Sequence, residues 1–237
     1  MNEQELTRFM REKDGALSLA FPALMRKVYV WMSLALIITG ITAYGVASSP
    51  GLITAFYTNR MLMWGVVIAE FALVFALSAA INRLSLSVAT LLFVVYSVLN
   101  GVMFSSIFLV YTMSSVANVF FITAGTFAAM AAYGYFTKSD LTTLGKYLLM
   151  ALIGLVIATV VNIFVGSSML SLVISYAGVL IFVGLTAYDS QKIKQMLAQQ
   201  VDADETAQKV ALFGALTLYL DFINLFLYLL RFLGNRR

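Results

Sequence analysis

Apolar residues occupy seven long runs along the chain, and short polar segments separate them. The runs cover residues 28–47, 61–80, 86–110, 116–136, 147–165, 170–188 and 211–233. A helix rises about 1.5 Å per residue, so about 20 apolar residues cross the ~30 Å hydrocarbon core of a bilayer. The pattern therefore predicts an all-α integral membrane protein, a bundle of seven transmembrane helices.

The connections between the runs are short, and only residues 190–209 are polar enough for a longer loop or a helical extension. We expect residues 1–27 to form a cytoplasmic N-terminal segment and residues 28–237 to form a single membrane domain. Pro22 and Pro50 lie outside the runs, so the helices should be unbroken, and Pro50-Gly51 predicts a turn. Small residues one turn apart predict close helix packing; these pairs are Gly125 with Ala129 and Gly154 with Ala158.

Lys and Arg favour cytoplasmic loops, and their distribution predicts the orientation of the bundle. If the N-terminus is cytoplasmic, eleven of the fifteen lie inside: Arg8, Arg11, Lys13, Arg26, Lys27, Arg83, Lys138, Lys146, Lys192, Lys194 and Lys209. Seven spans then place Arg231, Arg236 and Arg237 outside. A re-entrant seventh segment is the alternative that would return them to the cytoplasm.

The amino-acid composition excludes several classes of functional site and partner. The chain is 62% hydrophobic and 11% charged, whereas soluble domains carry roughly 25% charged residues. It has no Cys and no His, which excludes disulfides, thiolate and imidazole metal sites and histidine-based catalysis. The net charge of +4 is dispersed, so we expect no nucleic-acid partner.

Three acidic residues lie within or at the edge of the apolar runs: Glu70, Asp189 and Asp221. A carboxylate at the centre of a spanning helix costs about 2.5–3.5 kcal/mol, so such a group usually faces the bundle interior or a water-filled cavity. We therefore interpret all three as functional candidates. The alternatives are a buried structural acid for Glu70 and, for Asp189, a surface carboxylate that pairs with Lys192 or Gln191.

The last run carries one polar stripe at helical spacing, formed by Gly214, Thr217, Asp221, Asn224 and Tyr228. Its other faces are apolar, which predicts that this helix is central, with the stripe toward a cavity or a polar helix. The sixth and seventh helices can be antiparallel neighbours, so Asp189 and Asp221 can meet if the helices are staggered. The alternative is a purely structural role, in which the Asp221 side chain hydrogen-bonds to a neighbouring helix and holds the two helices together. Asn100, in the third run, can also line a cavity.

Three motifs resemble the signatures of the Bax inhibitor-1 family, in particular its bacterial, YccA-like branch. They are GLTAYDSQKIK at residues 184–194, ALTLYLDFINLFLYLLR at residues 215–231 and GYFTKSDL at residues 134–141. The resemblance implies a seven-helix bundle whose last helix is surrounded by the other six. It also implies a pH-sensitive calcium leak through the bacterial inner membrane.

The resemblance also implies site residues. The family's two proton-sharing aspartates correspond to Asp189 and Asp221. We also expect these two carboxylates to coordinate calcium. A bacterial relative has a regulatory arginine at the cytoplasmic end of its second helix. Arg83 is the nearest candidate for that role in this sequence. We expect Glu70, Asn100 and Asn224 to line the ion pathway. The expected partners are the lipid bilayer, calcium ions and protons, and no cofactor is expected.

Two carboxyl groups close together cannot both ionise cheaply, so the pair should share one proton and the leak should rise with pH. Two alternatives remain. One is an interaction protein that modulates a membrane protease or a stress response. The other is an intramembrane aspartyl protease: Tyr188-Asp189 matches one motif of that class, but the second motif, Gly-x-Gly-Asp, is absent at Asp221. We therefore expect no enzymatic activity.

Overall fold

The computed structural model describes the backbone of residues 3–200 and 202–237, with side chains described from residue 21 onward except at residue 201. The helices are α1 (Glu3–Ala47), α2 (Pro50–Thr58), α3 (Arg60–Ala79), the 3₁₀ helix η1 (Ile81–Arg83), α4 (Leu86–Phe104), α5 (Ile107–Val110), α6 (Met113–Phe136), α7 (Thr142–Val165), α8 (Ser168–Ala198) and α9 (Glu205–Leu233). Seven of them are long and apolar enough to span a membrane, as predicted.

The N-terminal helix differs from the prediction. α1 is continuous from Glu3 to Ala47 and contains Pro22, which was expected to lie outside the helix of the first apolar run. Proline removes one backbone hydrogen bond from a helix, which does not end α1 here. Pro50 also lies in a helix, because α2 begins at this residue, where a missing N–H leaves no bond unmade.

The third predicted run is split into α4 and α5 at Ser105 and Ser106. The hydroxyl of Tyr57, from α2, donates to the carbonyl of Met103 at 3.1 Å and accepts from the N–H of Ser106 at 3.2 Å. Ser105 Oγ donates to the Val102 carbonyl at 2.6 Å. These bonds satisfy backbone groups that the break exposes, as an apolar environment requires.

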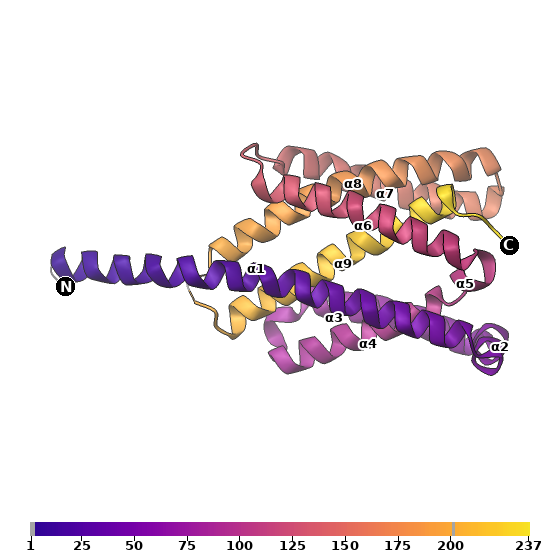
Figure 1. Ribbon diagram of the computed structural model, residues 1–237, viewed down its shortest axis with the longest axis horizontal. Coiled ribbons are helices and arrows are strands. Elements are labelled where there is room, and N and C mark those ends of the chain that lie inside the picture. Colours follow the sequence, from indigo (N-terminus) through magenta and orange to yellow (C-terminus); the bar gives the residue numbers. More distant parts are fainter. Residues whose placement is uncertain (1–2, 201) are drawn as a thin grey trace.

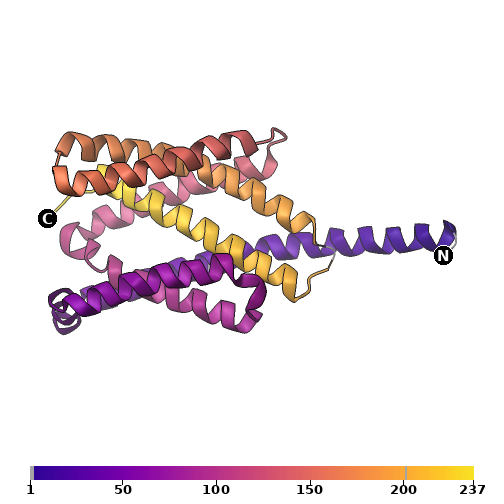
Figure 2. The same cartoon turned by 180° about the vertical axis from the view of Figure 1, so that it is seen from behind.

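α9 lies at the centre of the bundle, as predicted. It runs obliquely between α1, α3 and α4 on one side and α6, α7 and α8 on the other (Figures 1 and 2). Its main contacts are with α1, α4, α6 and α8, whereas α3 packs on α4 and α7 on α8. In the most apolar stretch of α9, 67% of the residues are buried, whereas the corresponding share is 6% in α3 and 6% in α7. The last helix is therefore surrounded chiefly by four helices, with two more outside them.

Close helix approach occurs at different glycines from those predicted. A Cβ on Gly134 of α6 would overlap the backbone carbonyl of Ala187 in α8. Gly125 and Gly154, by contrast, have nothing within 4 Å of an added Cβ, so the predicted packing there is wrong. In uniformly apolar helices such as α6 and α7, the spacing of small residues does not distinguish the inward face from the lipid face.

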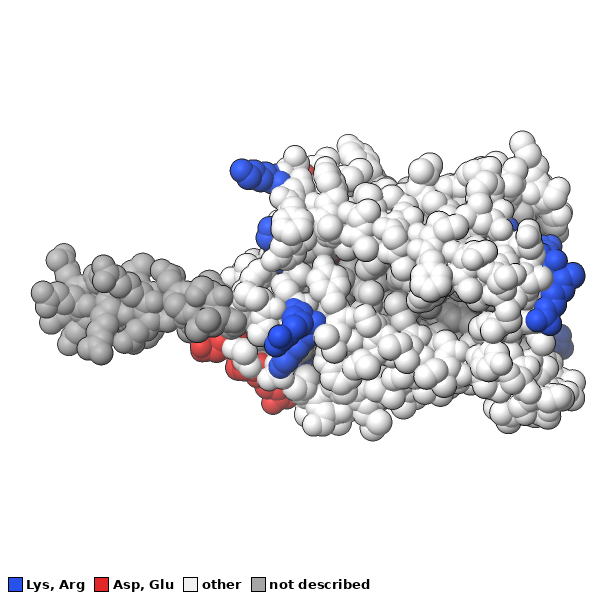
Figure 3. Space-filling view, viewed as in Figure 1, with Lys and Arg blue, Asp and Glu red and all other residues white. Residues whose placement is uncertain are grey.

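Charged side chains gather at the two ends of the molecule and leave the middle of the visible face uncharged (Figure 3). We call the end that carries the N-terminal half of α1, η1 and the α6–α7 and α8–α9 connections the basic end. At the opposite end the C-terminal residues pair with the start of α6: the N–H of Thr112 donates to the Asn235 carbonyl at 3.2 Å. α9 crosses without a break, so the re-entrant alternative is wrong for this structure.

We predict that the basic end is cytoplasmic and the C-terminus extracytoplasmic, because most Lys and Arg lie at the basic end. Alkaline phosphatase fused after Arg237 should be active, whereas the same enzyme inserted between Asp202 and Asp204 should be inactive. Activity at the second site together with inactivity at the first would contradict the predicted orientation.

Gly134→Ala should lower the free energy of unfolding by about 1–3 kcal/mol, because the added methyl group meets a rigid backbone carbonyl. Unfolding in mixed detergent micelles measures this change. Gly125→Ala, on the same helix but facing open space, is the matched control and should leave stability unchanged. Equal effects of the two substitutions would show that Gly134 is not a required contact.

Candidate functional site

Asp189 of α8 and Asp221 of α9 face each other where these two helices pack. Their carboxyl groups lie close enough to hydrogen-bond with each other. Asp221 is only 5% exposed, and its Oδ2 has no hydrogen-bond partner among the described residues. Ionised carboxylates only accept hydrogen bonds, so a bond between the two side chains requires that one carries a proton. We call these two residues the aspartate pair.

The pair meets because α9 crosses α8 obliquely (Figure 1). Small residues allow close approach on both sides of it. The Gly214 backbone lies against the Ile193 side chain toward the basic end. Toward the opposite end, the Tyr228 ring lies over Gly178 and stacks on Phe182 with 5.8 Å between the ring centroids. The polar stripe of α9 therefore faces α8, as the sequence predicted for a polar helix.

The other stripe residues bond within their own helix. Thr217 Oγ1 donates to the Phe213 carbonyl at 3.0 Å, and Asn224 Nδ2 donates to the Leu220 carbonyl at 2.8 Å. Asn224 follows Asp221 by three residues and so lies on the same face of α9. Its amide oxygen is a potential ligand next to the aspartate pair.

The cation that acts on the aspartate pair is Lys192, three residues after Asp189 on α8. Its ammonium group also lies 5.7 Å from the centre of the Tyr188 ring. Arg83, which the family resemblance suggested, is exposed in η1 and forms no ion pair with either aspartate within the described part of the chain. The structure thus brings Asp189 and Asp221 together and leaves Arg83 apart.

Polar residues after Asp189 anchor the end of α8, a role that the sequence analysis missed. Ser190 Oγ donates to the Ala131 carbonyl at 2.8 Å, and Lys194 Nζ donates to the Tyr135 carbonyl at 2.7 Å. Gln191 accepts from the N–H of Leu141 at 2.9 Å and donates to a carbonyl in the α6–α7 connection. The motif therefore fixes α8 to α6 and α7, and Gln191 is a structural residue rather than the partner of Asp189.

A second buried polar cluster lies on another side of α9. Tyr219, fully buried, shares a 2.7 Å hydrogen bond with Thr39 of α1, and Thr39 donates to the Ser97 carbonyl of α4 at 2.9 Å. The rings of Phe93 and Tyr96 pack edge-on against Tyr219. Thr39 and Tyr219 were not singled out in the sequence, because nothing in a single helix shows which hydroxyls meet across helices.

Glu70 and Asn100 belong to this second cluster and not to the aspartate pair. Asn100 Nδ2 donates to the Tyr96 carbonyl at 3.0 Å. Glu70 Oε1 is buried without a hydrogen-bond partner in the described residues, and Glu70 lies on α3, which packs on α4. The predicted site residues are thus divided between two faces of the central helix.

The acidic side chains do not form a preassembled metal cage. Among the described residues, no group of three or more Asp, Glu, His or Cys side chains could hold a metal ion. Calcium prefers six to eight oxygen ligands. The two carboxylates expected to meet calcium would therefore supply only part of a coordination shell, and a hydrated ion in transit would retain much of its water.

Asp140, in the α6–α7 connection, is exposed and is not a member of either cluster. Its carboxylate accepts from the N–H of Thr142 at 2.8 Å at the start of α7. Hydrogen bonds from Thr142 hold the pKa of Asp140 below its usual value. Asp140 is therefore ionised throughout the range from about pH 5 to pH 8, and this makes it a suitable control position.

Comparison with known proteins gives a consistent assignment. The family model described as "Inhibitor of apoptosis-promoting Bax1" matches residues 22–237. The chain is 51% identical over 215 residues to the inner membrane protein YbhL of Escherichia coli K12, covering 90% of this chain and 92% of that protein. It is 47% identical over 213 residues to an uncharacterized protein of Borreliella burgdorferi, covering 90% and 92%. An uncharacterized membrane protein of Streptococcus pyogenes is 41% identical over 184 residues, covering 78% and 79%.

Tyr219→Phe should lower the free energy of unfolding by about 0.6–1.5 kcal/mol, because it removes the hydroxyl that joins α9 to α1. Tyr176→Phe is the matched control, since Tyr176 is 49% exposed on α8. Unfolding in mixed micelles compares the two variants. If Tyr176→Phe were as destabilising as Tyr219→Phe, the buried hydrogen bond would not be a stabilising link.

Proposed function

Because the chain belongs to the Bax inhibitor-1 family, we propose that it is a pH-sensitive calcium leak channel gated by the aspartate pair. Its similarity to an inner membrane protein supports a location in the bacterial inner membrane. The single observation that carries the proposal is the contact between the carboxyl groups of Asp189 and Asp221 across the α8–α9 interface.

A shared proton closes the interface in this mechanism. The protonated pair forms a carboxyl–carboxylate hydrogen bond between α8 and α9, and charge-assisted bonds of this kind are stronger than neutral ones. Loss of the proton leaves two negative charges. At about 4 Å and an effective dielectric constant of 20, such charges repel each other by ~4 kcal/mol. Repulsion of this size favours separation of the two helices at the basic end.

The ion pathway would follow the face of α9 that the charges open. Carboxylate and amide oxygens are ligands that hard cations prefer. Asp189, Asp221 and Asn224 supply such oxygens on the α8 side of α9, and Glu70 and Asn100 supply others on the α4 side. Arg83, exposed near the start of α9, would meet ions at the mouth of this pathway rather than the closed pair. Calcium is the transported ion in this proposal, and protons control its passage.

The alternative functions are distinguished by the same assay. An interaction protein that modulates a membrane protease or a stress response would give no flux at any pH. An intramembrane aspartyl protease would cleave a helical peptide, with both aspartates positioning a water molecule. The sequence argues against the protease, because the Gly-x-Gly-Asp motif of that class is absent at Asp221.

Calcium flux into liposomes that contain the purified protein should rise more than tenfold from about pH 5 to pH 8. The repulsion of ~4 kcal/mol is large enough for such a change, since each 1.4 kcal/mol is a factor of ten. Asp189→Asn and Asp221→Asn should each flatten this dependence, because an amide cannot lose the shared proton. Flux is recorded with an entrapped calcium indicator.

Asp140→Asn removes one negative charge near the same end of the molecule and should leave the pH profile unchanged. Wild-type pH dependence in both aspartate-pair variants would contradict the gate even if the protein conducts calcium. Equal changes in the pH profile of Asp189→Asn, Asp221→Asn and Asp140→Asn would also show that the aspartate pair has no special role.

A further inference from the structure

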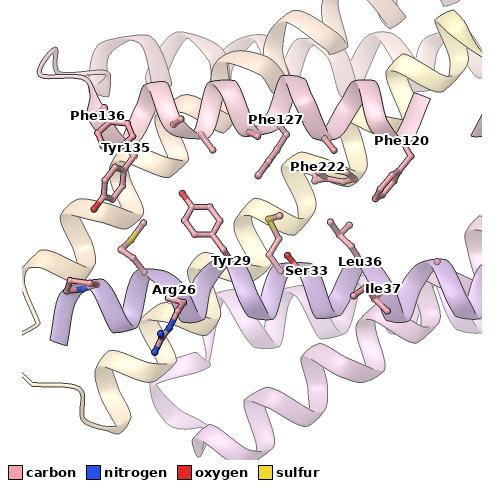
Figure 4. Close-up of a pocket in the computed structure, with 18 of the residues that line it drawn as sticks. Arg26, Tyr29, Ser33, Leu36, Ile37, Phe120, Phe127, Tyr135, Phe136 and Phe222 are labelled. Atoms are coloured by element: carbon pink, nitrogen blue, oxygen red, sulfur yellow. The ribbon is translucent and has the colours of Figure 1, made fainter. Parts of the chain in front are cut away.

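A long groove lies between α1 and α6, with α9 as its floor. Both helices pack on α9 but scarcely touch each other. The cavity between them has a volume of about 1000 Å³, at the upper end of the range for ligand sites. Figure 3 shows this face hollowed, and Figure 4 shows the lining side chains projecting from both helices into the space.

The groove exists because α6 presents small side chains to it. Its α6 wall contains four alanines, Ala124, Ala128, Ala131 and Ala132, and Phe222 of α9 forms part of its floor. A second cavity of about 350 Å³ shares Leu36, Gly40, Phe120 and Phe222 with the first and continues it toward α5. The groove thus opens along the bundle at membrane depth, where its surroundings are lipid.

The groove is polar at the basic end and apolar deeper in the membrane. Arg26, Tyr29 and Ser33 line the polar part, and Leu36, Ile37 and Phe120 line the apolar part. Figure 4 shows the Tyr29 ring reaching toward α6, while the exposed Arg26 side chain extends from the other side of α1 at the mouth. Among the residues whose side chains are described, no acidic side chain lines either cavity.

Two polar groups in the groove have no protein partner. Several hydroxyls elsewhere in the spans bond to the carbonyl four residues earlier in their own helix, as Thr123 and Thr186 do. Within the part of the chain whose side chains are described, Ser33 and Tyr29 make no such bond and no other side-chain hydrogen bond. Ser33 is exposed and Tyr29 is half-buried, so both hydroxyls are accessible to a polar group of a ligand at their depth in the groove.

We propose that the groove between α1 and α6 binds one anionic phospholipid from the leaflet at the basic end. Arg26 supplies positive charge for the phosphate at the mouth, the hydroxyls of Tyr29 and Ser33 bond to the ester oxygens, and the acyl chains lie along the alanine wall. Lys194, whose ammonium group lies 5.0 Å from the Tyr135 ring at the end of the groove, adds positive charge there. Cations near the membrane surface favour anionic lipids.

The dimensions of the groove fit this ligand. Arg26 and Gly40 are fourteen residues apart on α1, which is about 21 Å along the helix axis. One leaflet contributes about half of the ~30 Å hydrocarbon core. The acyl chains of a lipid held at Arg26 therefore remain within the groove along their whole length. This inference does not depend on calcium conduction.

Native mass spectrometry in detergent tests the proposal, with equimolar phosphatidylglycerol and phosphatidylethanolamine as probes. Wild type should retain one phosphatidylglycerol. Ala128→Phe fills the groove and should lose the bound lipid, with Ala132→Phe as a second groove-filling variant. Ala129→Phe, on the same helix but outside the groove lining, is the matched control and should retain the lipid. Thermal unfolding checks that each variant is folded.

Arg26→Gln should lower the preference for phosphatidylglycerol over phosphatidylethanolamine about fivefold, the effect expected of one cation near a membrane surface. Retention of the lipid by both groove-filling variants would overturn the proposal, as would its equal loss from Ala129→Phe. An unchanged preference in Arg26→Gln would overturn the assignment of the phosphate. A lipid-free dimer that Ala128→Phe separates would instead identify a second copy of the chain as the occupant.

Discussion

Two carboxyl groups on neighbouring transmembrane helices remain together in an apolar interior only while they share a proton. The packing of α8 on α9 is organised around this constraint. Gly214 lies against the Ile193 side chain and Gly178 against the Tyr228 ring, one on each side of the aspartate pair, so the two helices pack closely there. The same closeness that makes the shared hydrogen bond strong makes the doubly ionised state unfavourable.

The rest of the bundle holds these two helices in position. α9 is enclosed by α1, α4, α6 and α8, and the Tyr219–Thr39 hydrogen bond ties it to α1. The end of α8 is fixed to α6 and to the start of α7 through Ser190, Gln191 and Lys194. These side-chain hydrogen bonds thus tie α9 to α1 and α8 to α6 and α7, and the aspartate pair lies where α8 packs on α9. In the proposed function, movement between α8 and α9 is linked to protonation of this pair.

Sequence alone was sufficient for features that depend on one helix at a time. Length and apolarity gave seven spans, and the stripe around Asp221 gave both the central position of α9 and its polar face. Features that depend on which helices meet were missed or wrong. Gly125 was expected to pack and faces open space, and the bond between Tyr219 and Thr39 joins residues 180 positions apart. Nothing in the sequence reveals the groove either, because it results from α1 and α6 packing on α9 without packing on each other.

The most direct test measures whether α8 and α9 separate at the basic end when the shared proton is lost. The chain contains no cysteine, so spin labels at Gln195→Cys and Thr206→Cys, both exposed, would be the only labels present. Pulsed electron paramagnetic resonance in nanodiscs gives the distance between them at about pH 5 and pH 8. The account predicts a longer distance at pH 8 in the wild-type background and no change with pH when Asp221→Asn is also present. A distance independent of pH in the wild-type background, or an equal change in the presence of Asp221→Asn, would contradict it.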